Sequence, residues 1–466
     1  MTAIRKEPDA FASEDAGTPV ALAALLTGTF VGTLSNGVVN VPLSQILAEF
    51  DAPLGSGVLV VVGFLLTFAA GMPMAGYVGD RFGRRRVYCS ALVVTAICSL
   101  GAAAAPSLQI LIAWRAMAGL AAAVFAPAVM GLIAWLFGPH RRARAVGAWA
   151  SVNGVGQAVG PSVGGLLADA AGWRWVFVPL APIAVFGLIL TVRSVPRYPA
   201  RKMRLDAIGA GSLTLGSASM ILGVTLVGTE STAGWIVAVL LVLSAVLVVH
   251  AVWHCLRVPV PFIDIRAVTE PRFARSACAA FSQMFALGAT LLAFPLYATG
   301  QGASTTLSGV LLFALPATMA LLAPLVGRFS DRLGARPVLR AGLVVLVIGQ
   351  VLLAVLTGVT TDIGVSTTVV LVVTGIGVAL VQTPAAAGST RSVAGAQGTG
   401  LGLFNLLRFG GSALGAAWVS VALHRWDYPV LFIVTAAVAG AGLAASFVGR
   451  DPVVGVLPEP ELSSQP

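Results

Sequence analysis

The chain alternates between long apolar runs and short polar segments from residue 19 to residue 448. A helix that crosses a bilayer needs about 20 mostly apolar residues, and each run is long enough for one crossing. The pattern therefore predicts an all-α polytopic membrane protein with fourteen spanning helices. Their approximate bounds are 19–41, 57–79, 87–105, 108–136, 143–168, 174–193, 207–228, 233–254, 273–297, 306–327, 338–357, 364–384, 396–422 and 428–448.

The two ends of the chain differ from these runs. Residues 1–18 are polar and of mixed charge. Because no small-residue cleavage site follows a short apolar core there, we expect a tail and not a signal peptide. Residues 451–466 are rich in Pro, Glu and Ser, which predicts a disordered tail.

Basic residues predict the orientation in the membrane. Of the 28 Lys and Arg residues, two lie inside apolar runs, and two, Arg174 and Arg425, lie in one set of alternate loops. The remaining 24 lie in the termini and in the other set of loops. Because short basic loops stay in the cytoplasm, both termini are predicted to be cytoplasmic. The undisturbed alternation also favours an even number of spans.

One short charged loop occurs twice. It reads GYVGDRFGRRR at 76–86 and returns 251 positions later as GRFSDRLGAR at 327–336. Such an internal repeat is typical of duplicated transporters. Two six-helix halves would place six spans between the copies, but eight runs separate them. The predicted division is a six-helix bundle at 19–193, a basic cytoplasmic linker at 194–206, two additional central helices at 207–254, a second cytoplasmic linker at 255–272 and a six-helix bundle at 273–450.

Composition excludes several classes of protein. The chain has 466 residues, of which 58% are hydrophobic and only 10% charged, whereas soluble domains carry about 25% charged residues. The net charge of +10 would suggest a nucleic-acid partner in a soluble protein, but here the basic residues lie in loops between spans, so none is expected. The phosphate-binding pattern GxxxxGK[ST] of primary pumps is absent from the sequence.

Cysteine and histidine spacing gives no metal or catalytic pattern. The four cysteines are scattered and are interpreted as buried thiols. Of the four histidines, only His250 and His254 lie four residues apart, and we interpret them as a pair at the membrane interface. No metal site, no catalytic residue and no enzymatic activity are therefore predicted.

Four motifs occur in order along the first six spans. Residues 76–85 match G-x-x-x-D-R-x-G-R-R, Arg115 precedes a small-residue run, residues 156–165 match G-x-x-x-G-P-x-x-G-G, and residues 173–177 read WRWVF. This series resembles the major facilitator superfamily, and within it the fourteen-helix drug:proton antiporter branch, over roughly residues 19–450. The resemblance implies secondary active export of small lipophilic compounds, such as drugs, antibiotics or secondary metabolites, by proton antiport and alternating access.

The resemblance also implies roles for the motif residues. The charged loop would latch the two halves together in the outward-open state, although a positive-inside anchor would also explain its arginines. Its residues are Gly76, Asp80, Arg81, Gly83, Arg84 and Arg85. The glycine-rich motif in the fifth span is typical of exporters, although close helix packing alone would explain its glycines. Its residues are Gly156, Gly160, Pro161, Gly164 and Gly165.

The sequence departs from this branch in its acidic residues. Proton-coupled carriers commonly hold an ionisable group within the membrane, but none of the 18 acids lies near the middle of a predicted span. Ser35 stands where the branch usually has an Asp, and Thr299 stands where it usually has a Gln. The sequence therefore assigns no residue to proton binding.

Two arginines, Arg115 and Arg408, lie within spans. A buried Arg needs a partner, which Asn36, Asn40, Gln157 or backbone carbonyls could supply. Both could be structural. Alternatively, a cavity with two guanidiniums and no carboxylate would disfavour organic cations and suit neutral or anionic compounds.

Polar residues within spans are the remaining candidates for a substrate cavity, although each could instead join helices. The candidates are Asn36, Asn40, Gln157, Gln283, Asn405 and Arg408.

The predicted function is export, with a same-fold importer or uniporter of a neutral or anionic solute as the alternative. A membrane receptor or enzyme is more remote, because no loop is large enough for a sensing domain. The expected partners are a small-molecule substrate, protons and membrane lipid. No cofactor is expected beyond the proton gradient. The excess of Arg over Lys suggests a bacterial source. We expect a multi-pass protein of the cell membrane that works as a monomer.

Overall fold

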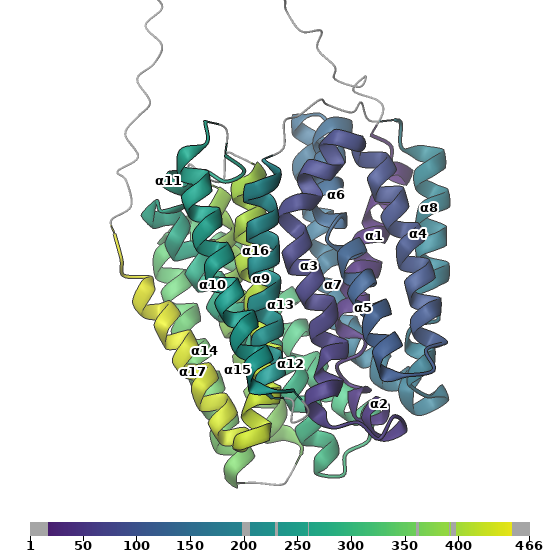
Figure 1. Cartoon of the computed structure of the whole chain (residues 1–466), viewed down its shortest axis with the longest axis vertical. Coiled ribbons are helices and arrows are strands. Elements are labelled where there is room, and N and C mark those ends of the chain that lie inside the picture. Colours follow the sequence, from purple (N-terminus) through teal and green to yellow (C-terminus); the bar gives the residue numbers. More distant parts are fainter. Residues whose placement is uncertain are drawn as a thin grey trace, which may run out of the picture.

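The structure is a computed structural model that describes residues 17–197, 206–228, 232–259, 261–359, 363–390, 392 and 398–449. This part of the chain is helical and contains no strand. Its long helices run side by side along the long axis of the molecule (Figure 1). The helices are α1 (Pro19–Gly37), α2 (Leu43–Glu49), α3 (Leu54–Phe82), α4 (Arg84–Ala103), α5 (Leu108–Ala122), α6 (Phe125–Leu136), α7 (Pro139–Ala171), the 3-10 turn η1 (Trp173–Val176), α8 (Leu180–Ser194), α9 (Ala207–Val227), α10 (Gly234–Arg257), α11 (Ile265–Val268), α12 (Pro271–Gly300), α13 (Thr305–Leu333), α14 (Ala335–Val359), α15 (Val365–Thr390), α16 (Gly398–Arg425) and α17 (Tyr428–Ala445).

The predicted runs are found as helices, with local differences. The run at 108–136 is divided into α5 and α6, because Pro127 in the first turn of α6 lacks the N–H that would bond the carbonyl of Ala123. A short helix that the hydropathy pattern did not predict, α2, lies between the first two spans. The predicted disordered tail and most of the basic linker lie outside the described residues.

Thirteen helical segments of the described part are long and apolar enough to cross a membrane. They include every predicted span except α7, which has 33 residues but carries basic residues in its first turns and many Gly, Ser and Asn residues after them. α1 begins and α17 ends at the same end of the bundle (Figure 1), as an even number of crossings requires. The fourteenth crossing and the cytoplasmic position of the termini stay predictions.

The two copies of the charged loop have the same backbone conformation. Gly83 separates α3 from α4 with φ of 93°, and Gly334 separates α13 from α14 with φ of 89°. Glycine adopts positive φ without the steric penalty that a side chain brings. The repeat in the sequence is therefore also a repeat of one tight turn between two long helices.

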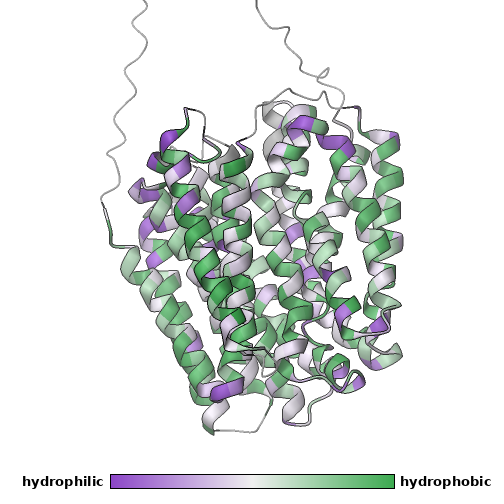
Figure 2. Cartoon of the chain, viewed as in Figure 1, coloured by the Kyte–Doolittle hydropathy of each residue, from purple (hydrophilic) through white to green (hydrophobic). Residues whose placement is uncertain are grey.

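The helices form two groups with an additional pair beside them. α1 to α8 lie on one side of Figure 1, and α12 to α17 lie on the other. α9 packs against α3 and α16, and α10 packs mainly on α9. The outward face of α10 is apolar and exposed, with Val239, Val242, Val246 and Val249 at its surface (Figure 2). Such a face is suited to lipid.

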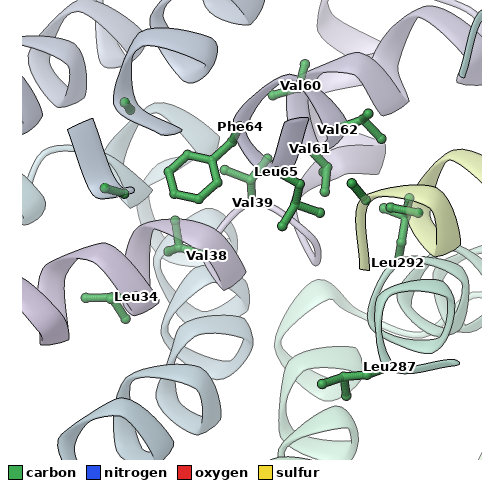
Figure 3. Close-up of a cluster of buried hydrophobic side chains, with 14 of the residues drawn as sticks. Leu34, Val38, Val39, Val60, Val61, Val62, Phe64, Leu65, Leu287 and Leu292 are labelled. Carbon is green, nitrogen blue, oxygen red and sulfur yellow. The ribbon is translucent and has the colours of Figure 1, made fainter. Parts of the chain in front are cut away.

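One hydrophobic core joins the two groups of helices. Leu34 of α1 and Val38, directly after α1, belong to the same cluster as Phe64 and Leu65 of α3, and the cluster continues to Leu292 of α12 (Figure 3). This core extends through the interior of both groups.

Candidate functional site

A cavity of about 580 Å³ lies between the N-terminal helices and α16. Its wall comes from α1, α3, α6, α7 and α16, and from the segments that flank α9 and α10. Along α3 it reaches from Phe68 to Asp80, which is about 18 Å of helix. It therefore extends to the predicted cytoplasmic end. Its volume suits a small organic ligand.

The opposite, predicted outer end of the molecule is sealed where α7 meets α13. The Ser162 hydroxyl donates to the carbonyl of Gly309 at 3.0 Å. The backbone N–H of Thr306 donates to Oδ2 of Asp169 at 2.6 Å, and Nε2 of Gln45 donates to the hydroxyl of Thr305 at 3.1 Å. The cavity thus reaches the predicted cytoplasmic end, and these hydrogen bonds close the molecule at the predicted outer side.

The glycine-rich motif lies on the faces of α7 that make close contacts. Gly156, Gly160 and Gly164 recur every fourth residue and face α1: a Cβ on Gly160 would lie 3.3 Å from Cα of Gly37, and one on Gly164 would overlap the carbonyl of Val38. A Cβ on Gly165 would lie only 2.6 Å from the carbonyl oxygen of Thr305 in α13.

Pro161 lies between these contacts. Its Cδ would be 3.3 Å from a Cβ on Gly37, and its carbonyl oxygen would be 2.9 Å from one on Gly309. The motif therefore serves close packing at the sealed end. Its association with export stays a prediction.

The charged loop forms several hydrogen bonds within the N-terminal helices. Nε of Arg84 donates to Oδ1 of Asp80 at 2.6 Å, and Nη1 of Arg84 donates to the carbonyl of Pro127 at 3.2 Å. Arg81 donates to the hydroxyl of Tyr77 at 2.7 Å, and Arg85 donates to a carbonyl of α8 at 2.7 Å. Gly76, Asp80 and Arg84 line the cytoplasmic end of the cavity. The latch between the two halves stays a prediction.

Arg115 is buried among α1, α3 and α5, with 1% of its surface exposed. Its Nη1 donates to the carbonyl of Ser35 at 2.9 Å and to the Ser35 hydroxyl at 3.2 Å, and its Nε donates to the carbonyl of Val60 at 3.2 Å. Its guanidinium also lies 4.4 Å from the ring centroid of Phe64. Arg115 does not line the cavity, so of the two embedded guanidiniums only that of Arg408 lies in the cavity wall among the described residues. Backbone carbonyls, among the partners considered, are the ones it uses.

Four of the six predicted cavity residues do line the cavity, namely Asn36, Gln157, Asn405 and Arg408. Nε2 of Gln157 donates to Oδ1 of Asn153, which also lines it. Asn40 and Gln283 do not line this cavity, and a role for them in substrate binding stays a prediction. Asn40 is buried in the turn that follows α1, and Gln283 is fully buried on α12, which contributes nothing to the wall.

Asp206 is a cavity residue that sequence reasoning placed only in an inner loop. Its side chain is 6% exposed, and it accepts from the N–H of Gly209 at 2.9 Å, the N–H of Phe262 at 3.1 Å and Nε2 of His254 at 2.8 Å. Burial raises the pKa of this carboxyl, but the three hydrogen bonds outweigh burial and lower the pKa overall. The available signal was an Asp directly before an apolar run, which is a typical N-cap.

The histidine pair fastens α10 to α9. His254 bonds Asp206, as above, and Nδ1 of His250 lies 3.0 Å from the hydroxyl of Ser212. Among the described residues, no three His, Cys, Asp or Glu side chains are arranged to hold a metal ion.

Long apolar helices in two groups, with a cavity between them that reaches one end and is sealed at the other, define a polytopic membrane transporter. The chain belongs to the major facilitator superfamily, whose family model matches residues 25–253 and 276–463. The resemblance predicted from the motifs is thereby confirmed, and the protein is a transporter and not an enzyme.

Individual relatives agree with this assignment. The chain is 31% identical to an uncharacterised transporter of the same superfamily from Mycobacterium tuberculosis, over 85% of this chain and 69% of that one. It is 32% identical to the methylenomycin A resistance protein of Bacillus subtilis, over 72% of each chain. The crystal structure of a peptide transporter is similar in fold, with a TM-score of 0.68 at 15% identity, covering 92% of this chain and 93% of that one.

Proposed function

We propose that this protein is a secondary active exporter of small lipophilic compounds, driven by proton antiport across a bacterial cell membrane. The observation that carries the proposal is the cavity, which reaches the predicted cytoplasmic end, while hydrogen bonds join α7 and α13 at the other end. A substrate taken up in this form comes from the cytoplasm or the inner leaflet. Relatives named for antibiotic resistance support export.

Alternating access would use the two contact regions described above. Opening the outer end requires α7 to separate from α13, which breaks the contacts around Thr305 and Gly309. Closing the inner end requires the charged loop to approach the C-terminal helices, where Asp80 would exchange its partner Arg84 for a helix N-terminus. This is the latch that the family resemblance implies.

Proton coupling needs an acid that both sides can reach. Within the described part, the acids that line the cavity are Asp80 and Asp206, both at its cytoplasmic end. Ser35 bonds Arg115 at the position where the branch usually has a carboxylate. We propose the proton gradient as the energy source without a further cofactor, and a monomer surrounded by lipid as the working unit.

The test uses everted membrane vesicles energised to an acid interior, with a pH-sensitive dye inside. Lipophilic compounds of anionic, neutral and cationic character are added one at a time, and their uptake is followed in parallel with proton release. Proton release that accompanies uptake, and that is absent from vesicles without the protein, is the expected result. Uptake without proton release would refute antiport.

A uniporter or importer of a neutral or anionic solute is the second candidate. The absence of a carboxylate near the middle of the described spans favours it. Right-side-out vesicles distinguish it from the exporter, because an importer or a uniporter would accumulate or equilibrate the solute without an opposing proton flux.

A further inference from the structure

The charged residues that line the cavity differ in whether they have hydrogen-bond or ion-pair partners within the protein. Among the described residues that line it, four carry a formal charge: Asp80, Arg84, Asp206 and Arg408. Asp80 and Arg84 form an ion pair at 2.6 Å. Asp206 is held by two backbone N–H groups and His254. The two acids are therefore already occupied, so an organic cation would have to compete with these partners.

Arg408 is the exception. Within the described part of the chain, its guanidinium has no hydrogen bond or ion pair, and it lies 5.0 Å from the ring centroid of Phe409. Arg408 lies ten residues from the start of α16, about 15 Å along the helix. It therefore stands deep in the cavity and not at the mouth. A guanidinium stays charged at all physiological pH values, and leaving it without an acceptor in an apolar surrounding is costly.

The surroundings of Arg408 match one kind of ligand. Asn405 lies three residues earlier and also lines the cavity, so its amide shares the face of α16 with the guanidinium. Phe68 and Phe409 form an edge-to-face pair with centroids 4.7 Å apart, and Met72 and Phe125 extend the apolar wall. A guanidinium binds a carboxylate through two parallel hydrogen bonds.

We infer that the cavity recognises amphipathic organic monoanions, with the carboxylate of the ligand bound by Arg408 and Asn405 and its apolar body packed on Phe68 and Phe409. This inference rests on the proposed function for the direction of transport, but not for binding. Arg115 cannot play this part, because Ser35 and Val60 already accept its hydrogen bonds and it lies outside the cavity.

The test compares two fluorescent probes of matched shape, pyrenebutyrate and pyrenebutyramide, on the purified full-length protein in nanodiscs at neutral pH. Binding is measured by fluorescence anisotropy, with empty nanodiscs subtracted. The acid should bind roughly tenfold to a hundredfold more tightly than the amide, because a hydrogen bond to a charged group is worth about 1.5–3 kcal/mol.

Two substitutions locate the preference. Arg408→Gln should reduce the difference between acid and amide to less than about threefold, and Arg408→Lys should retain part of it, because lysine keeps the charge but not the paired donors. The matched control is Arg328→Gln, which removes a charge from an exposed position of α13 outside the cavity and should keep the wild-type preference. If Arg408→Gln does not fold, Arg408→Lys still tests the geometry.

The outcomes separate this inference from the proposed function. Equal binding of acid and amide, or a preference for the acid that survives Arg408→Gln, overturns the inference even if vesicles export neutral compounds against protons. A preference for the acid that depends on Arg408 supports the inference even if vesicles show no antiport.

Discussion

Replacing Gly165 by alanine should weaken the seal at the predicted outer end of the transporter. Gly165 faces α13 across the boundary between the two helix groups, and its Cβ would lie 2.6 Å from the carbonyl oxygen of Thr305 and 3.3 Å from Cγ1 of Val41. A carbon normally stays about 3.3 Å or more from a carbonyl oxygen. The oxygen belongs to the backbone, so rotation of a side chain cannot relieve the overlap.

The cost follows from this overlap. Relief of roughly 0.7 Å requires α7 and α13 to separate, and extra methyl groups in a close-packed contact cost about 1–3 kcal/mol. The hydrogen bonds from Ser162 to Gly309 and from Thr306 to Asp169 cross the same contact and would lengthen. Because the methyl group acts mainly on the outer-closed form, the ratio of outer-open to outer-closed molecules should rise about 5- to 150-fold.

A reporter cysteine measures this ratio. Asn36 lines the cavity, so Asn36→Cys in a chain without its four native cysteines can be labelled by an impermeant thiol reagent from either side. Gly165→Ala should raise the rate of labelling from outside. Gly154→Ala is the matched control, because a Cβ on Gly154 of the same helix meets nothing within 4 Å. Equal rates in the two variants, with both eluting as folded protein, would refute the reasoning.

Three further predictions concern buried and paired groups. Arg174 and Trp173 donate hydrogen bonds to the carboxylate of Glu49, and these contacts hold its pKa below the ordinary value of 4.5. The ionised carboxylate therefore stabilises the fold above pH 4.5, and this contribution is lost as pH falls. The unfolding temperature of the wild type should drop more below pH 4.5 than that of Glu49→Gln, and parallel curves would contradict this. In Arg115→Lys, the ammonium cannot reproduce the hydrogen bonds that the guanidinium donates to backbone carbonyls, so the free energy of unfolding should fall by about 1–3 kcal/mol. The measurement is the unfolding temperature in detergent, and an unchanged temperature would show that those bonds contribute little. Asp206→Asn offers one oxygen in place of two to its three donors, so hydrogen exchange at the backbone amides of Phe262 and Ile263 should accelerate; unchanged protection would mean that other contacts hold this segment.

The helices and their order could be predicted because hydropathy reports the length of each span directly. The division between α5 and α6 was harder, since Pro127 lies in an apolar stretch that hydropathy reads as continuous. α7 shows the reverse case. It carries too many polar and small residues to pass as a span by hydropathy, yet its motif predicted a helix at close contact, which the glycine geometry explains.

The cavity could be predicted only in part, because its wall depends on how each helix is rotated. Gln283 and Asn405 are both amides within apolar helices, and the sequence does not distinguish them. Gln283 of α12 is fully buried among other side chains, whereas Asn405 of α16 lines the cavity. Asp206 was missed as a cavity residue for a different reason. It lies at the start of the additional helix pair, and nothing local predicts that this pair packs against α3 and α16.

The two embedded arginines, Arg115 and Arg408, show how helix rotation also determines function. Each is a single cation in a mostly apolar span, so the sequence alone does not distinguish their roles. Arg115 has three accepting groups on α1 and α3 around it, so its charge is used to hold those helices together. Arg408 has an aromatic ring beside it and open volume in front of it. A buried cation that lies outside the cavity and bonds neighbouring helices cannot contact a substrate, whereas a cation in the cavity wall can. The charge preference of the transporter should therefore follow Arg408 alone, and substitution of Arg115 should change stability without exchanging an anionic for a cationic substrate.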